Sequence, residues 1–180
     1  MVFLSPRAAR LVMAVAALFG FFFSGYLFYV YVTGAPIACA IVSGCDMIRA
    51  SEWANSFGIP RPFFGLLFYG ALFQMLVLRA ALAKWAKPLH AFTVALAVIG
   101  FIESGVLFVI QWLDLKAFCF WCLLSGIAAM VIFIVSLRDR PMLASSDETR
   151  TSELRRYLWL LLGYVPIAIL GFSWLVFWRT

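Results

Sequence analysis

The sequence predicts an all-α integral membrane protein, and three observations carry that prediction. Of the 180 residues, 66% are hydrophobic and only 12% are charged, whereas about a quarter of the residues in soluble domains are charged. The apolar residues form unbroken runs of about 20 residues, which is the helix length that crosses a hydrocarbon core of about 30 Å. The runs also lack the alternation of barrel strands, so helices must satisfy the backbone hydrogen bonds in lipid.

Five apolar runs mark the expected membrane spans, at about 11–32, 62–83, 89–112, 117–137 and 157–178. We expect the first four to form a helical bundle and the fifth to be an additional transmembrane helix. The first run is about twice as long as the apolar region of a signal peptide, so it is expected to stay as an anchor. Segment 33–61 is expected to be an outer loop, and the polar segment 138–156 a solvated cytoplasmic loop.

The basic residues predict the orientation of these spans. With a cytoplasmic N-terminus, ten Lys and Arg residues lie in inner segments and four in outer segments. The positive-inside rule favours this arrangement, which places segment 33–61 on the periplasmic or extracellular side of the cell (inner) membrane. Because these residues do not form a stripe interleaved with base-stacking aromatic residues, no nucleic-acid partner is expected.

All four cysteines fall on the predicted outer side. Cys39 and Cys45 lie in the first outer loop, whereas Cys119 and Cys122 lie where the fourth span begins. Cysteines that serve only as buried apolar residues would be scattered through the spans. The outer compartment is also where disulfides persist, so the grouping indicates disulfide chemistry.

The second pair forms a C-x-x-C motif, Cys119-Phe120-Trp121-Cys122. At a helix start this spacing places the two sulfurs one turn apart, and the N-terminal dipole favours a reactive thiolate. The same spacing supplies half of many zinc sites, although the first pair is spaced more widely than zinc ligands usually are and His90 lies on the other face. A redox pair, a four-cysteine metal site and static disulfides in a non-enzymatic membrane assembly factor therefore all stay open; we expect no metal.

The order of the motifs is specific. A cysteine pair in the first outer loop is followed by 57–65, which reads Phe-Gly-Ile-Pro-Arg-Pro-Phe-Phe-Gly, and then by 116–122, which reads Lys-Ala-Phe-Cys-Phe-Trp-Cys. This arrangement resembles the vitamin K epoxide reductase family, particularly its bacterial members, over about residues 11–137. The resemblance implies a bundle built around a quinone site, with ubiquinone or menaquinone as the cofactor.

The resemblance also implies a role for each cysteine. Cys122 resembles the residue that meets the quinone, and Cys119 the residue that exchanges with the loop. Cys45 resembles the loop partner of that exchange, and Cys39 the residue that exchanges with a soluble thioredoxin-fold protein. Some bacterial relatives carry a fused thioredoxin-like domain, which is absent from the sequence up to Thr180. A separate DsbA-like partner is therefore expected.

The expected quinone contacts combine the family pattern with aromatic residues near the C-x-x-C motif. In the vertebrate enzymes an Asn before the second span and a Tyr after the C-x-x-C contact the quinone oxygens, but here these positions hold Arg61 and Gly126. Disulfide formation is therefore expected rather than epoxide reduction. The candidate contacts are Arg61, Phe64, Gln111, Phe118 and Trp121, with Ser51 nearby; helix capping for Ser51, interfacial anchoring for Arg61 and ordinary aromatic packing are the alternatives.

One carboxylate lies inside a predicted span. Glu103 is about nine residues from the outer end of the third span, where ionisation in lipid is costly. We expect it to be protonated and bonded within the bundle beside Ser104, and a proton route for quinone reduction is the alternative. The pairs Gly20 with Ser24 and Gly100 with Ser104 are typical of close helix contacts.

Overall fold

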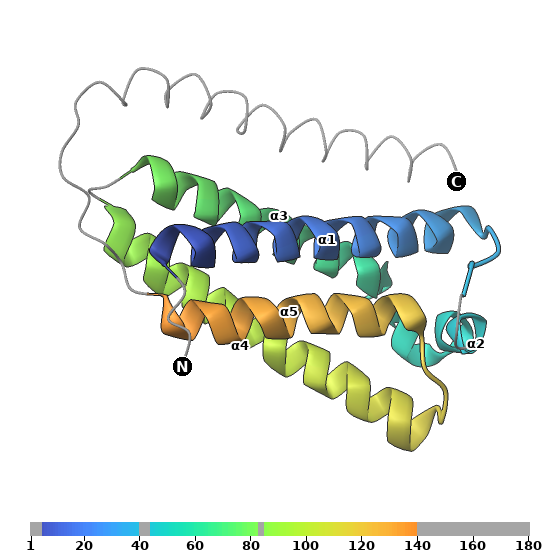
Figure 1. The fold of residues 1–180 in the computed structure, drawn as a ribbon. Helices are drawn as coiled ribbons and strands as arrows, with labels where there is room; N and C mark the ends of the chain where they lie inside the picture. Colours follow the sequence, from blue (N-terminus) through green and yellow to red (C-terminus); the bar gives the residue numbers. More distant parts are fainter. Residues whose placement is uncertain (1–4, 40–43, 83–84, 140–180) are drawn as a thin grey trace.

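Four long helices make up most of the computed structural model, which describes residues 5–39, 44–82 and 85–139 (Figure 1). They are α1 (Pro6–Thr33), α3 (Arg61–Ala81), α4 (Ala86–Val109) and α5 (Phe120–Arg138). A π-helical turn, Ile110–Asp114, prolongs α4. All four helices are long and apolar enough to cross a membrane.

These helices overlap the first four predicted spans, and the all-α membrane fold is confirmed. The fourth helix begins at Phe120 rather than at 117, because residues 116–119 have no regular structure. The expected fifth span, 157–178, and all of the loop 138–156 beyond Asp139 lie outside the described residues.

The helices run alternately up and down, and each packs against two neighbours. Helix α1 packs against α3 and α5, and α4 packs against the same two helices. One end of the bundle therefore gathers the end of α1, the start of α3, the end of α4 and the start of α5 (Figure 1). We call this the cysteine end, since both cysteine pairs lie there.

The middle of the bundle is packed through small residues and aromatic rings. A methyl group added at Gly20 of α1 would overlap the ring of Tyr69 in α3, and one added at Gly65 of α3 would press on the Ser24 hydroxyl. Gly100 of α4 is covered in the same way by an aromatic ring of α3. The small residues predicted at helix contacts therefore let these helices approach closely.

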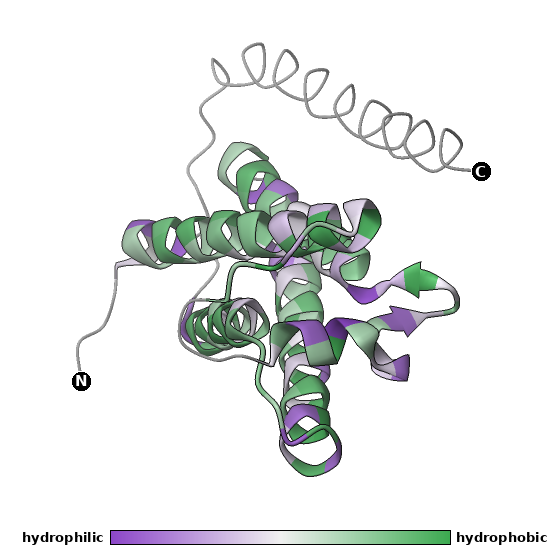
Figure 2. Cartoon of the chain, turned by 90° about the vertical axis from the view of Figure 1, so that its right-hand side faces the viewer, coloured by the Kyte–Doolittle hydropathy of each residue, from purple (hydrophilic) through white to green (hydrophobic). Residues whose placement is uncertain are grey.

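The outward faces of the bundle are apolar. Figure 2 views the molecule from the cysteine end, and the helices are largely coloured as hydrophobic. Large side chains that are more than half exposed occur on all four long helices, among them Leu11, Phe22, Leu67, Phe92 and Leu137. Such a surface suits lipid rather than water, as expected of a multi-pass membrane protein.

A buried ion pair joins α3 to the end of α5, far from the cysteines. Arg79 and Asp139 lie 2.7 Å apart, and their side chains are only 4% and 0% exposed. The expectation that Asp139 begins a solvated loop is therefore wrong at this residue. Its carboxylate follows the last turn of α5 directly and turns towards the guanidinium at the end of α3, since an unpaired charge there would be costly.

The segment between α1 and α3, predicted only as a loop, has structure of its own. It contains the short helix α2 (Cys45–Ala50), a 3-10 turn (Glu52–Ala54) and a hairpin of β1 (Asn55–Ser56) with β2 (Ile59–Pro60), in which Ser56 pairs with Ile59. Phe57 and Gly58 have φ angles of 56° and 78°. Two positive φ values are what a tight two-residue hairpin turn requires.

Candidate redox site

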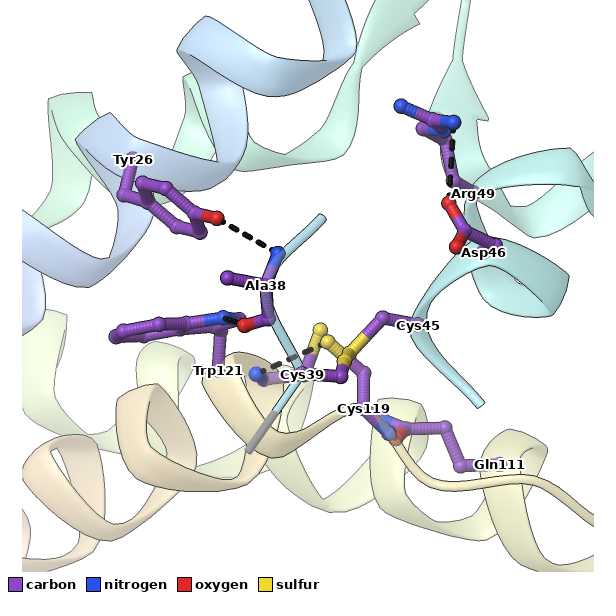
Figure 3. Close-up of a disulfide and its surroundings, with 10 residues drawn as sticks. Tyr26, Ala38, Cys39, Cys45, Asp46, Arg49, Gln111, Cys119 and Trp121 are labelled. Atoms are coloured by element: carbon purple, nitrogen blue, oxygen red, sulfur yellow. Dashed lines mark hydrogen bonds and ion pairs between the residues drawn. A yellow bond between two sulfur atoms is a disulfide. The ribbon is translucent and has the colours of Figure 1, made fainter. Parts of the chain in front are cut away.

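The four cysteines meet in one apolar cluster at the cysteine end. Cys39 and Cys45 form a disulfide with their Cα atoms 6.4 Å apart, and Cys119 and Cys122 are free thiols. The apolar residues around them come from α1, from the segment after α1 and from α2, and are Leu27, Val30, Ile37 and Ile48. Figure 3 shows the disulfide beside Cys119. The fold thus brings an oxidised pair against a reduced pair.

The cysteines differ in exposure. Cys45 and Cys119 are each only 1% exposed, whereas Cys39 and Cys122 are partly exposed. Gly44 explains how the two buried residues come together. A Cβ atom added at Gly44 would lie 2.7 Å from the carbonyl oxygen of Phe118 and 2.8 Å from its nitrogen. The backbone before Cys45 therefore lies directly on the backbone before Cys119.

Cys119 caps the N-terminus of α5. Its backbone is extended, and its sulfur accepts a hydrogen bond from the backbone N–H of Cys122 at 3.4 Å. The pKa of the Cys119 thiol lies below its ordinary value, chiefly because of the hydrogen bond with the Cys122 side chain. The backbone N–H groups of Cys122 and Trp121 lower the pKa further, and burial opposes them. The helix start thus favours a thiolate at Cys119, as the C-x-x-C spacing predicts.

Gln111 fixes the backbone that leads into the C-x-x-C. It lies in the π-helical turn after α4 and is only 4% exposed. Its side-chain oxygen accepts the N–H of Cys119 at 2.9 Å, and its backbone oxygen accepts the N–H of Ala117 at 3.1 Å. The sequence makes Gln111 a candidate quinone contact; the structure buries it, with its amide oxygen on the backbone N–H of Cys119.

The segment before Cys39 is held by side chains. The indole N–H of Trp121 donates to the carbonyl of Ala38 at 2.8 Å, and the N–H of Ala38 donates to the Tyr26 hydroxyl at 2.9 Å. The two rings lie 4.7 Å apart. Arg49 of α2 donates to the carbonyl of Ala35 at 2.6 Å. The indole N–H of Trp121, a predicted quinone contact, is therefore used in a hydrogen bond to the loop.

Arg61 is engaged in a polar network on the rim. Its guanidinium pairs with Glu103 at 3.3 Å, donates to the Ser56 hydroxyl at 3.0 Å and lies 5.9 Å above the ring of Trp53. The expectation that Glu103 is bonded within the bundle beside Ser104 is wrong. Its side chain is 58% exposed, because this face of α4 turns outward and Arg61 lies within reach.

The other candidate contacts lie at different places. The Ser51 hydroxyl donates to the carbonyl of Ile48 at 2.7 Å, at the C-terminal end of α2. Phe64 is 41% exposed on α3. Phe118 lines an open surface pocket of about 390 Å³, for which the other lining residues are Trp112, Leu113 and Lys116. Neither thiol of the C-x-x-C lines this pocket.

Three contributors to the site are missed by the sequence analysis. Tyr26 binds the backbone of Ala38 in the loop that carries the first pair, and Gly44 of that loop lies against the backbone of Phe118. The indole N–H of Trp53 donates to the Asp114 carboxylate at 2.6 Å and joins the 3-10 turn to the end of α4. The one available signal was that Tyr26 lies near the cysteine end of the first span, where a hydroxyl can reach a loop.

Comparison with known proteins settles the relationship. The model of the vitamin K epoxide reductase family matches residues 11–137. The chain belongs to this family. Thiol-disulfide oxidoreductase LTO1 of Arabidopsis thaliana is 27% identical over 128 residues, which is 64% of this chain and 32% of that protein. This vitamin K epoxide reductase family member thus spans about a third of that relative's length, and the resemblance seen in the motifs is confirmed.

Proposed function

We propose that the chain is a quinone-dependent thiol–disulfide oxidoreductase that reoxidises a soluble thioredoxin-fold, DsbA-like partner. Electrons would pass from the partner to Cys39/Cys45, then to Cys119/Cys122, then to ubiquinone or menaquinone. Family membership supports thiol–disulfide chemistry. The observation that carries the relay is the contact between an oxidised and a reduced cysteine pair, in which Cys39 is the more exposed member of the loop pair.

The first exchange is with the partner. A partner thiolate attacks the sulfur of Cys39 in the Cys39–Cys45 disulfide, and Cys45 leaves as a thiolate. The partner's second thiolate then attacks the first, releasing Cys39. Two partner thiols become a disulfide, and the loop pair gains two electrons and two protons. The partial exposure of Cys39 and the burial of Cys45 support this order.

The second exchange is internal. The Cys45 thiolate attacks Cys119 in the Cys119–Cys122 disulfide, and Cys122 leaves. The Cys39 thiolate then attacks Cys45, and Cys119 leaves. A thiol with a lowered pKa is the better leaving group, so the environment of Cys119 favours this last step. The oxidised loop pair and reduced C-x-x-C of the structure correspond to the product of this exchange.

The reduced pair must then be reoxidised. A bound quinone supplies an acceptor for two electrons and two protons, and Cys119 and Cys122 lose these as their sulfurs join. Aromatic surface suited to a flat ring lies beside the C-x-x-C segment, because Phe118 directly precedes Cys119. Trp121 packs 5.8 Å from the ring of Phe23, adding aromatic surface next to the thiols.

The described charges support the proposed orientation. The end of the bundle opposite the cysteines carries Arg7, Arg10, Arg79, Lys87 and Arg138, whereas Arg49, Arg61 and Lys116 lie at the cysteine end. The positive-inside rule then places the N-terminus in the cytoplasm and the cysteines on the periplasmic or extracellular side of the cell membrane. Disulfides persist in that compartment.

The direct test is turnover. Purified full-length chain, supplied with a quinone and a reduced thioredoxin-fold protein, should form quinol and oxidise the protein, and Cys119→Ser should abolish both. Unchanged quinone absorbance with the unmodified chain would rule the proposal out. Static disulfides of an assembly factor would also resist a glutathione buffer, whereas the Cys39–Cys45 disulfide should exchange with it.

Trapping tests the order of the relay. In Cys45→Ala, Cys39 is the only thiol left in the loop, and it should capture the partner as a mixed disulfide. The matched variant Cys39→Ala leaves the buried Cys45 and should capture far less. Equal capture by both variants would contradict the assigned order.

A further inference from the structure

The backbone of one residue in the redox loop, Ala38, is bound by side chains through both its N–H and its carbonyl. The N–H of Ala38 donates to Tyr26 of α1 and its carbonyl accepts from Trp121 of α5, at 2.9 and 2.8 Å. The two rings pack on each other with centroids 4.7 Å apart, so they form one surface (Figure 3). We call Tyr26 and Trp121 together the Ala38 cradle.

The position of the cradle in the chain gives it chemical meaning. Ala38 directly precedes Cys39, so holding the backbone of Ala38 restricts the position of the Cys39 sulfur. Trp121 lies between the two cysteines of the C-x-x-C motif. One hydrogen bond therefore connects the backbone of one redox pair to the residue inside the other.

We propose that Tyr26 and Trp121 are positioning residues for the internal disulfide exchange: they hold Ala38 so that Cys39 is placed to displace Cys119 from Cys45. This inference rests on the proposed relay. In the step concerned, the Cys39 thiolate attacks the sulfur of Cys45 in the Cys45–Cys119 mixed disulfide. The Cys39–Cys45 bond forms, the Cys45–Cys119 bond breaks, and Cys119 leaves as the thiolate; no net oxidation occurs.

The contacts suit a reversible hold better than permanent packing. Ala38 is exposed, both rings are only partly buried, and both hydrogen bonds are open to solvent. Water can replace each bond at small cost when the loop departs. Gly44, packed on the backbone of Phe118, places Cys45 against Cys119. The cradle then positions Cys39, which carries the third sulfur of the exchange.

The proposal can be tested without quinone or partner, so that its failure is separable from failure of the proposed function. In a Cys122→Ser background the full chain keeps three cysteines and forms one disulfide. Its isomers, Cys39–Cys45 and Cys45–Cys119, interconvert by the proposed step. After equilibration, acid quenching, alkylation and peptide mass spectrometry give their ratio.

The variants each remove one hydrogen bond and keep an aromatic ring at the position. Tyr26→Phe and Trp121→Phe should each shift the ratio towards Cys45–Cys119 by roughly 2- to 10-fold, the range for loss of one hydrogen bond. The controls are Tyr29→Phe, a 62% exposed tyrosine on the same helix, and Trp85→Phe, a 61% exposed tryptophan next to α4. An unchanged ratio in both cradle variants, or an equal shift in the controls, overturns the proposal.

A kinetic readout separates positioning from general stability. With Cys39 and Cys45 both changed to Ser, the chain reduced by dithiothreitol should pass electrons to a soluble quinone equally fast with and without Tyr26→Phe. In the four-cysteine chain Tyr26→Phe should slow loop-to-quinone transfer and accumulate the Cys45–Cys119 species. Equal losses in both settings would show a structural role only.

Discussion

At the scale of single residues, the site depends on the hydrogen bonds that neighbouring residues make with Cys119. Its sulfur meets the N–H groups of the first turn of α5, and its own N–H is taken by Gln111. One interaction sets the charge of the sulfur and the other sets its place. Substitutions can separate the two effects.

The charge effect predicts a pH dependence. Because the pKa of Cys119 is below its ordinary value, its alkylation by iodoacetamide should stay fast at pH values where a free thiol is protonated, and should fall only at lower pH. Removing the first cause with Cys122→Ala should raise the pKa and move the alkylation profile to higher pH. Cys122→Ser, which keeps a hydrogen-bonding side chain, should move it less. Superimposable profiles for the three proteins would contradict this account.

The placement effect predicts a loss of stability. Gln111→Leu leaves the buried N–H of Cys119 without an acceptor, which costs about 1–3 kcal/mol in the free energy of unfolding. Gln111→Glu keeps an oxygen in reach and should cost less. Gln74→Leu, at a half-buried position of α3, is the matched control and should change little. Denaturant unfolding followed by circular dichroism in detergent measures the three changes.

At the scale of elements, the short segments between helices determine which groups meet. Helix α2 lies on the backbone before α5 through Gly44, and the 3-10 turn is tied to the end of α4 through Trp53 and Asp114. The hairpin reaches back to α3 through Ser56 and Arg61. Because Tyr26 of α1 also accepts the N–H of Ala38, the loop is attached to all four long helices.

The close approach at Gly44 gives a steric prediction. Its φ of −85° suits any residue, but a methyl group would press on the backbone of Phe118. Gly44→Ala should therefore displace α2 and reduce the yield of the Cys45–Cys119 disulfide in the Cys122→Ser background, by a large factor. Gly105→Ala, where nothing lies within 4 Å of the added carbon, should leave the yield unchanged. Equal yields in the two variants would mean that this contact does not govern docking.

The buried pair at the opposite end belongs to the same scale, because it joins α3 to α5. Asp139→Asn leaves the Arg79 guanidinium buried without a counter-charge and should destabilise the chain by about 3–5 kcal/mol. The double variant Arg79→Met with Asp139→Leu removes both charges and should recover most of that loss. Thermal unfolding of the single and double variants decides, and a double variant no better than the single would contradict the buried-charge explanation.

At the scale of the whole molecule, run length and hydropathy predict the fold but not its contacts. Spans of sufficient length in alternating directions place both cysteine pairs at one end, and that much follows from where the apolar runs begin and stop. The helices are apolar on nearly all sides, so periodicity does not mark which face turns inward. The exposure of Glu103, the burial of Asp139 and the bond from Trp121 to Ala38 depend on helix rotation, which the sequence does not display.

For the site, the sequence likewise predicts which residues are involved but not the contacts between them. Cysteine spacing and helix position identified the two pairs, because those depend on local sequence. The inward turn of Gln111 depends on the extra residue of a π-helical turn, and the cradle joins residues 83 positions apart with one bond and 12 apart with the other. Such long-range pairs are settled by packing, where no local pattern records them.

The cluster that holds the cysteines draws on both ends of the family domain. Cys45 follows the first long helix and Cys119 precedes the last described one, and the two touch only when α1, α3, α4 and α5 have come together. A chain that is still being inserted carries two separate, unconnected pairs. Under the proposed relay, electron transfer between the two pairs therefore requires the assembled bundle, and an incompletely assembled chain should pass no electrons from the loop to the C-x-x-C.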